Sequence, residues 1–310
     1  MQYPLQKDLR APSARALRAP PARRALRAGM VLLSCWSGLA CASDWTLGAG
    51  AGVLHDSNVG NAEPYDDIVG DTIIGAHLSA AQLLPLGTAY SLTVGGEVAG
   101  AVYHRITGLN DASADASILL KHKWGLGAYV PWATLGFSAG RTSYDASYRN
   151  TWDYHAALAA GQRVERWSFW AEYAFDQHAA RAQEDEVPGI SGDAFSTTGR
   201  TLSAHAGYAL TERVFLTLAL SARHGEVIST TEENDRVYDA SRAVAEDPAF
   251  GDEYYAYKIT GNTYGASAGV ELALGPHNAL RLGCSRFETH AYGGNDYVKS
   301  LPEITWSYSF

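Results

Sequence analysis

Apolar and polar residues alternate along much of this chain, and the alternation is clearest in its last nine residues, 302–310. Every second position there carries an apolar or aromatic side chain, and the positions between carry polar ones. A period of two predicts a β-strand with one apolar face and one polar face. The apolar positions are Ile304, Trp306, Tyr308 and Phe310.

Eleven further segments share this period, which gives twelve expected strands. Short turns are expected at about 85–88, 125–128, 165–166, 211–213 and 275–278, and longer polar segments lie between them. Ten or fourteen strands stay open, because the acidic, Tyr-rich segment 224–259 is long enough to hide a hairpin. The eleven segments cover about 45–55, 71–83, 89–104, 113–124, 131–141, 151–163, 167–177, 200–210, 214–223, 261–274 and 279–288.

The alternation and the connections together indicate a membrane barrel. No stretch reaches 18 apolar residues, so the sequence predicts no transmembrane helix. A barrel needs only half of each strand to be apolar, and its closure removes every sheet edge, as lipid requires. We therefore expect an all-β fold, a transmembrane antiparallel β-barrel of about 12 strands. A soluble β-sandwich of similar size is the alternative.

The closing strand carries a family resemblance. Termini fray, so an exposed apolar end gains little in water. An alternating strand that stops on Phe310 resembles the last strand of bacterial outer-membrane β-barrels. The resemblance implies location in the outer membrane of a Gram-negative bacterium, among outer-membrane lipid and lipopolysaccharide. It also implies recognition of the closing strand by the barrel-insertion machinery, through Trp306, Tyr308 and Phe310.

The first part of the chain has the pattern of an export signal. Residues 1–29 are rich in Arg, Ala and Pro, and the short apolar core 30–40 follows them. The core ends at Ala40-Cys41-Ala42, a small-x-small pattern typical of signal-peptidase sites. Translation from Met30 would leave no basic region, which favours including the arginines of residues 1–29 in the leader. Both start sites, Met1 and Met30, stay open. We expect a basic leader plus signal peptide at 1–42 and the barrel at 43–310.

Charge and cysteine content exclude several classes of function. The chain has a net charge of −9, and the leader holds seven of its 24 basic residues, so the barrel itself is acidic. An acidic body repels the phosphates of nucleic acids, so we expect no nucleic-acid partner. Cys284 is alone beyond the leader, so no disulfide is expected within the barrel. We also expect no cofactor and no metal site.

Charged residues also occur on the polar, inward-facing side of the expected strands, among many small residues. They either line a narrow aqueous pore and set its selectivity, or pair across a closed lumen. The residues predicted to line the lumen are Glu97, Lys121, Lys123, His155, Glu172, Glu271 and Arg281. The same face also carries His77, Asp153, Arg163, His205 and Glu303.

One string has the residue types of a hydrolase. His55-Asp56-Ser57-Asn58 resembles the His-x-Ser strings that outer-membrane lipid hydrolases such as outer-membrane phospholipase A carry at a strand end. A Ser nucleophile needs a neighbouring His and a third orienting group, and no third partner is evident in the sequence. Ordinary turn chemistry explains the same residues, so the chain is not expected to be an enzyme.

Two further patterns bear on partners. The Gly-rich first strand with Asp56-Ser57-Asn58-Val59, and the stretch 223–227, resemble the barrel domains of surface-lipoprotein assembly modifier proteins. The acidic stretches 184–186 and 232–235 lack the spacing of a calcium loop. The leading expectation is a small porin or narrow channel for small polar solutes. A structural, assembly or partner-binding barrel that acts through its surface loops is the alternative.

Overall fold

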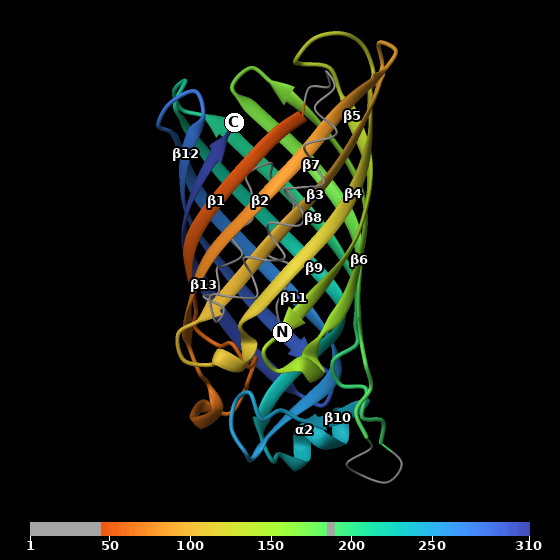
Figure 1. Cartoon of the computed structure of the whole chain (residues 1–310), viewed down its shortest axis with the longest axis vertical. Coiled ribbons are helices and arrows are strands. Elements are labelled where there is room, and N and C mark those ends of the chain that lie inside the picture. The colour runs from red at the N-terminus through yellow and green to blue at the C-terminus, as the bar shows by residue number, and fades with distance from the viewer. Residues whose placement is uncertain (1–44, 185–189) are drawn as a thin grey trace, which may run out of the picture.

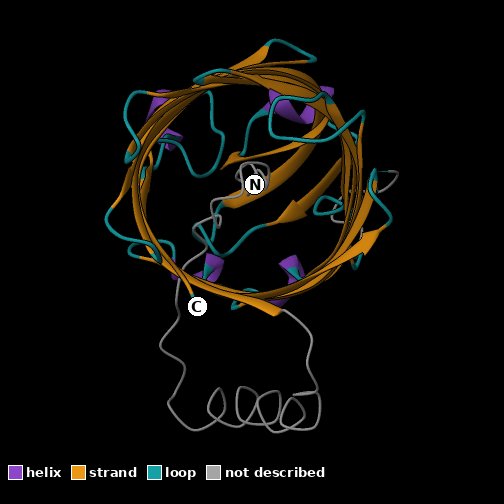
Figure 2. Cartoon of the chain, turned by 90° about the horizontal axis from the view of Figure 1, so that it is seen from above, coloured by secondary structure: helices purple, strands orange, loops and turns teal. Residues whose placement is uncertain are grey.

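The computed structural model describes residues 45–184 and 190–310, so the predicted leader and its cleavage site lie outside the described residues. Twelve long strands form a closed antiparallel barrel (Figures 1 and 2), which confirms the predicted fold class and strand number. The wall strands are β1 (Trp45–Asp56), β2 (Asp71–Leu86), β3 (Tyr90–Tyr103), β4 (Asp111–Lys123), β5 (Trp132–Tyr144), β6 (Thr151–Val164), β7 (Trp167–Ala180), β8 (Thr197–Ala209), β9 (Val214–Glu232), β11 (Tyr254–Ala273), β12 (Asn278–Ala291) and β13 (Asn295–Ser309).

The first and last strands close the barrel against each other. β1 pairs with β13 in antiparallel register from Gly48 opposite Ser309 to Leu54 opposite Glu303. Phe310 extends this seam, because its backbone N–H donates to the carbonyl of Leu47 at 3.0 Å. Closure therefore leaves neither β1 nor β13 as a free edge, which a sheet in lipid requires.

The outer surface is apolar, as the alternation predicts. Leu158, Leu202 and Leu220 are 57%, 59% and 66% exposed, and they point away from the barrel. Exposed aromatic residues stand near the strand ends, where membrane proteins place their interfacial girdles. They include Trp45, Tyr90, Trp124, Trp152, Trp167 and Tyr264. Within residues 45–184 and 190–310, no helix has the length and apolar character that a membrane span would need.

The two ends of the barrel differ in how the strands are joined. Short turns gather at the end where the C-terminus lies (upper end in Figure 1). The other end carries most of the longer connections and the small elements η1 (Tyr65–Asp67), η2 (Thr107–Leu109), η3 (Ser147–Arg149), α2 (Asp235–Ala240) and β10 (Ala243–Glu246). This asymmetry is that of outer-membrane barrels, whose short turns face the periplasm.

The last hairpin departs from the sequence-based expectation. A loop was expected near 289–297, but β12 runs to Ala291 and β13 starts at Asn295. The three-residue turn between them contains Gly293 and Gly294, whose φ angles of 79° and 72° favour glycine. The closing strand therefore begins seven residues before Pro302, where its alternating part starts. The turn between β12 and β13 is also a short connection at the end of the barrel that carries most of the long ones.

The expected loop 224–259 is mostly ordered strand. β9 and β11 continue past the barrel wall and stay paired with each other as far as Glu232 opposite Tyr254. β10 pairs with the first part of β11, and α2 lies between β9 and β10. The segment thus holds the hairpin extension that the sequence left open, and it adds no strand to the ring of twelve.

Candidate functional site

The interior of the barrel is polar and is the candidate site. Strand alternation puts the residues between lipid-facing positions on the inner side of the wall. All seven residues predicted to line the lumen stand at such inner positions, and Glu172 is buried there. They are Glu97 on β3, Lys121 and Lys123 on β4, His155 on β6, Glu172 on β7, Glu271 on β11 and Arg281 on β12.

Positive charge gathers on β4 to β6 near the short-turn end. The Nζ atom of Lys121 lies 4.9 Å from the centre of the Trp132 ring. The Nζ atom of Lys123 donates to the carbonyl of Gly127 at 3.3 Å, and Nε of Arg163 donates to the carbonyl of Glu165 at 3.1 Å. These contacts hold the three cations close to the wall rather than across the lumen.

Negative charge lies on the wall opposite. The strand order puts β4, β5 and β6 across the ring from β11, β12 and β13. Glu271 stands opposite Arg281 in the β11–β12 register, and Nε of Arg281 lies 3.5 Å from Oε1 of Glu303. Arg281 thus pairs with one of two carboxylates on this wall, and Glu271 stands beside it in the register. In the half of the lumen next to the short turns, the cations of β4 and β6 therefore face a wall with two carboxylates and one cation.

The middle of the wall carries a paired polar network. Asp153 accepts hydrogen bonds from Thr142 at 2.6 Å and contacts Nδ1 of His178 at 2.7 Å. Nη2 of Arg223 donates to Asp176 at 2.9 Å. These charges are satisfied locally, so opposite charges do pair within the barrel as well as line it. A polar cavity borders this network, lined by Asp115, Ser138, Thr142, Asp153, His155, Asp176 and His178 among others.

A second inner network joins β7 and β8. The Ser203 hydroxyl and Nε2 of His205 are 2.8 Å apart and buried, and the His205 ring stacks on Trp170 with centroids 4.6 Å apart. Glu172 stands opposite Ser203 in the register. In the parts of the chain that the structure describes, no three His, Cys, Asp or Glu side chains are arranged to hold a metal ion.

The mouth of the barrel at its long-connection end is covered by its own chain. Residues 226–260, here named the mouth plug, comprise the β9–β11 extension with α2 and β10. The successive residues Val227, Ile228 and Ser229 are 0%, 6% and 0% exposed, so both faces of this strand are buried. Figure 2 looks along the barrel and shows strands and loops inside the ring of wall strands.

The connection between β1 and β2 fastens one side of the mouth plug. The Nδ2 atom of Asn61 donates to the carbonyl of Ile228 at 3.0 Å, and the Ser229 hydroxyl donates to the carbonyl of Asn61 at 2.9 Å. The Thr230 N–H donates to the carbonyl of Gly60 at 2.7 Å. These hydrogen bonds satisfy buried polar groups of both segments, as burial demands.

A buried ion pair, here named the latch, fastens the other side. Arg149 of η3 binds the Asp247 carboxylate through Nε at 3.0 Å and also through Nη2. The Tyr148 hydroxyl donates to Asp247 at 3.0 Å, and the Thr230 hydroxyl donates to it at 3.0 Å. Burial and the nearby Asp247 charge raise the pKa of Tyr148, so its phenol stays protonated and able to donate.

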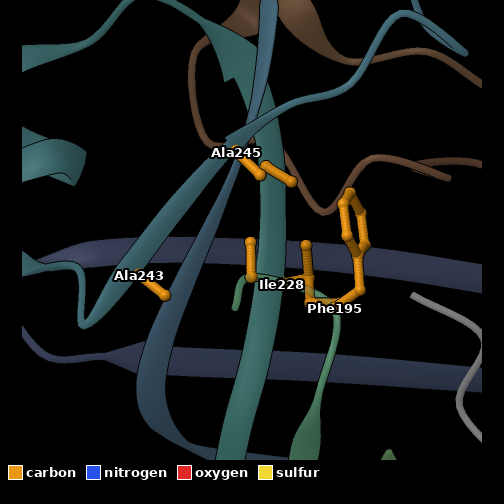
Figure 3. Close-up of a cluster of buried hydrophobic side chains, with 6 residues drawn as sticks. Phe195, Ile228, Ala243 and Ala245 are labelled. Carbon is orange, nitrogen blue, oxygen red and sulfur yellow. The ribbon is translucent and has the colours of Figure 1, made fainter. Parts of the chain in front are cut away.

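Small apolar side chains fill the remaining contact between the mouth plug and the wall. Phe195 precedes β8 and packs with Ile228, Ala243 and Ala245 of the mouth plug (Figure 3). Nζ of Lys258 lies 3.2 Å from Oδ2 of Asp193 at the same boundary. A second apolar cluster packs Ala249 and Phe250 of the mouth plug against buried loop residues that include Ile106 and Leu109.

Solved structures of other proteins support the fold, whereas comparison of the sequence assigns no family. No family model matches the sequence, and no curated protein is similar to it. An outer-membrane channel from Pseudomonas putida F1 is similar in structure, with a TM-score of 0.53 and 10% identity over 87% of this chain and 97% of that one. The fold is that of a porin-like outer-membrane barrel.

Two other solved structures are more distant. The NanC porin has a TM-score of 0.44 and 9% identity over 84% of this chain and 100% of that one. LpxR from Salmonella typhimurium has a TM-score of 0.37 and 11% identity over 83% and 99%. The apolar exterior around this porin-like barrel locates the chain in the outer membrane of a Gram-negative bacterium.

The string that suggested a hydrolase is not assembled as a catalytic pair. Nδ1 of His55 lies 3.2 Å from the Thr72 hydroxyl on the outside of the barrel. The Ser57 hydroxyl instead accepts a hydrogen bond from the Ser300 N–H at 2.8 Å. Asp56, which lies between them, binds Nζ of Lys299 at 2.8 Å. Asp56 and Ser57 therefore fasten the seam between β1 and β13, whereas His55 contacts β2.

No pattern in the sequence predicts the latch. Arg149 and Asp247 are 98 positions apart, and both lie outside the alternating segments. Of the acidic stretches considered, 184–186 extends beyond the described residues. In the other, Asn234 caps α2 by accepting a hydrogen bond from the Val237 N–H at 3.2 Å. The sequence carries no periodic signal for residues whose partners come from different loops.

Proposed function

We propose that this porin-like barrel is a narrow channel for small polar solutes. The observation that carries the proposal is the charge distribution in the half of the lumen next to the short turns, where the cations of β4 and β6 face two carboxylates and one cation on β11 to β13. Charged rings and opposed charges in a pore select solutes by sign and orient polar molecules as they pass.

Ion selectivity tests the proposal. Protein purified from outer membranes is placed in a planar bilayer, and the reversal potential is measured under a KCl gradient. Lys121→Gln is expected to shift selectivity toward cations, and Glu271→Gln is expected to shift it toward anions. Arg286→Gln is the matched control, because Arg286 is exposed on the outer face of β12 and loses the same charge.

The contrary result is equally specific. Channel openings whose ion selectivity is unchanged by both inner substitutions, or changes equally with Arg286→Gln, would show that ions do not pass Lys121 and Glu271. A barrel that stays silent even after its mouth plug is released would favour the second candidate function, a structural or partner-binding barrel. The covered mouth favours that candidate, because it presents a folded loop surface rather than an opening.

A further inference from the structure

The mouth plug leaves the barrel wall at a row of glycines. β8 pairs with β9 only as far as Gly199 opposite Gly225, and β12 pairs with β11 only as far as Ala291 opposite Gly261. Gly225 and Gly261 stand directly opposite each other in the β9–β11 register. Beyond this row the β9–β11 hairpin has no strand pairing with β8 or β12, and single hydrogen bonds such as that from the Tyr292 N–H to the Thr260 carbonyl remain.

Close backbone approach explains the glycines. A Cβ atom on Gly225 would lie 2.4 Å from the carbonyl oxygen of Thr198, and one on Gly199 would lie 2.1 Å from Nη2 of Arg223. Glycine within a strand marks such a bend or close approach. Arg223 spans the bend, because Nη1 donates to the carbonyl of Glu226 at 3.1 Å while Nη2 binds Asp176.

The far side of the mouth plug is held differently from its base. At the base it continues the strand pairing of β9 with β11. Beyond the base it is held by side-chain contacts with separate loops. The latch lies near the tip, whereas the hydrogen bonds of Asn61 and the Lys258–Asp193 pair lie closer to the glycines. A stiff hairpin with a glycine base that is fastened to separate loops by side-chain contacts can move as one body.

We propose that the mouth plug is a gate, hinged at Gly225 and Gly261 and released when the Arg149–Asp247 latch separates. This inference rests on the proposed channel function. Solutes reach the outer end of the lumen only when the mouth plug leaves the loops that contain Gly60, Asn61 and Arg149. Polar contacts and two apolar clusters hold the closed state, and water replaces the polar contacts more readily than packed apolar surface.

A reversible disulfide tests the gate. A Cβ atom on Gly60 would lie 3.7 Å from Cβ of Thr230, close to the mean separation of about 3.8 Å in disulfides. The double variant Gly60→Cys with Thr230→Cys is made in a chain whose three native cysteines are replaced by serine. Bond formation is checked by mass spectrometry. The same protein in its reduced form is the control, because it carries the same substitutions.

The gate predicts loss of conductance on oxidation and its return with reductant. Equal conductance of the oxidised and reduced forms, with the bond verified, would overturn the gate and leave the channel function intact. Silence of the native protein, the reduced variant and a latch variant alike would overturn the channel function, and the gate with it.

A latch variant gives an answer even where the disulfide does not form. Asp247→Asn removes the charge that pairs with buried Arg149, and it is expected to increase the fraction of time the channel is open. Glu246→Gln is the matched control, because it removes a neighbouring carboxylate that is exposed. An open fraction that is the same for Asp247→Asn and Glu246→Gln would overturn the gate.

Discussion

Tyr148 and Arg149 are neighbours in the chain and bind the same carboxylate, that of Asp247. Arg149 is 6% exposed and Asp247 is fully buried, so neither charge is hydrated. The rings of Phe195 and Phe250 lie 4.7 and 5.6 Å from the Arg149 guanidinium and exclude water further. Removing one member of such a pair typically costs about 3–5 kcal/mol, because the other charge is left buried.

The Tyr148 phenol gives the latch a dependence on pH. Its pKa is raised by burial and by Asp247, so the contribution to stability is complete below the ordinary tyrosine pKa of 10.0 and is lost as pH rises through the raised value. We expect protease cleavage within 233–253 to increase above about pH 10, and Tyr148→Phe to be cleaved more at neutral pH with a weaker response to alkali. A native barrel and a Tyr148→Phe variant with identical profiles would contradict this role.

At the residue scale, alternation alone predicts which side chains of a strand face inward, whereas contacts between distant loops have no such signal. A strand shows which side chains face inward, and Glu271 and Arg281 follow that rule. The pairing of Arg281 with Glu303 depends on which strands are neighbours, and that of Arg149 with Asp247 depends on how loops fold over the mouth. Neither is encoded in a local period.

At the scale of elements, one strand shows two environments along its length. Up to Gly225, β9 alternates between exposed leucines and inner polar or small residues. From Val227 to Thr231 every residue is buried, because the mouth plug packs on both faces. The period of two is therefore absent from the second part, and the sequence placed the strand end at 223 rather than at Glu232.

The closing strand expected from the sequence, 302–310, is shorter than β13 for a related reason. Between 295 and 301, inner residues such as Asn295 and Lys299 are polar although buried. Their outer neighbours Asp296 and Ser300 are polar too. Side chains of 295–301 do alternate between the two faces of the strand, but their polarity does not alternate. The sequence therefore predicts a strand only from Pro302 onward.

The wall part of β9 allows a direct test of its two faces. Leu220 is 66% exposed near the middle of the lipid-facing band, and Thr217 points inward on the same strand. Leu220→Arg is expected to destabilise the barrel by about 2–4 kcal/mol, the cost of Arg at the bilayer midplane. Thr217→Arg is expected to have a much smaller effect. Unfolding by denaturant in lipid vesicles measures both, and equal destabilisation would contradict the assigned faces.

At the scale of the whole molecule, the last residue of the chain contributes few contacts to the folded barrel. Phe310 adds one backbone hydrogen bond to Leu47 and a ring contact to Tyr308, and its side chain is exposed. We propose that Trp306, Tyr308 and Phe310 serve recognition by the insertion machinery. Deleting Phe310 is expected to lower the amount of folded barrel in cells while changing the heat resistance of the purified barrel little.

Matched measurements separate these roles. The folded fraction in outer membranes is read from heat-modifiable mobility on gels, and the same assay on purified protein gives the unfolding temperature. Deletion of an interior turn residue such as Gly87, which lies in a short turn with φ of 78°, controls for general loss of folding. An unfolding temperature that falls as steeply as the cellular yield would assign Phe310 a structural role alone.

The seam between β1 and β13 also constrains the order of folding. The Lys299–Asp56 ion pair joins residues 243 positions apart. Its formation therefore closes a very long loop, and the conformational entropy of that loop is lost before the contact stabilises the barrel. Until β13 is present, both edges of the sheet are open, and open edges invite pairing with other chains. The nascent protein therefore cannot mature strand by strand. Its barrel closes only once β13 pairs with β1, so the edge of β1 needs protection from other chains until then.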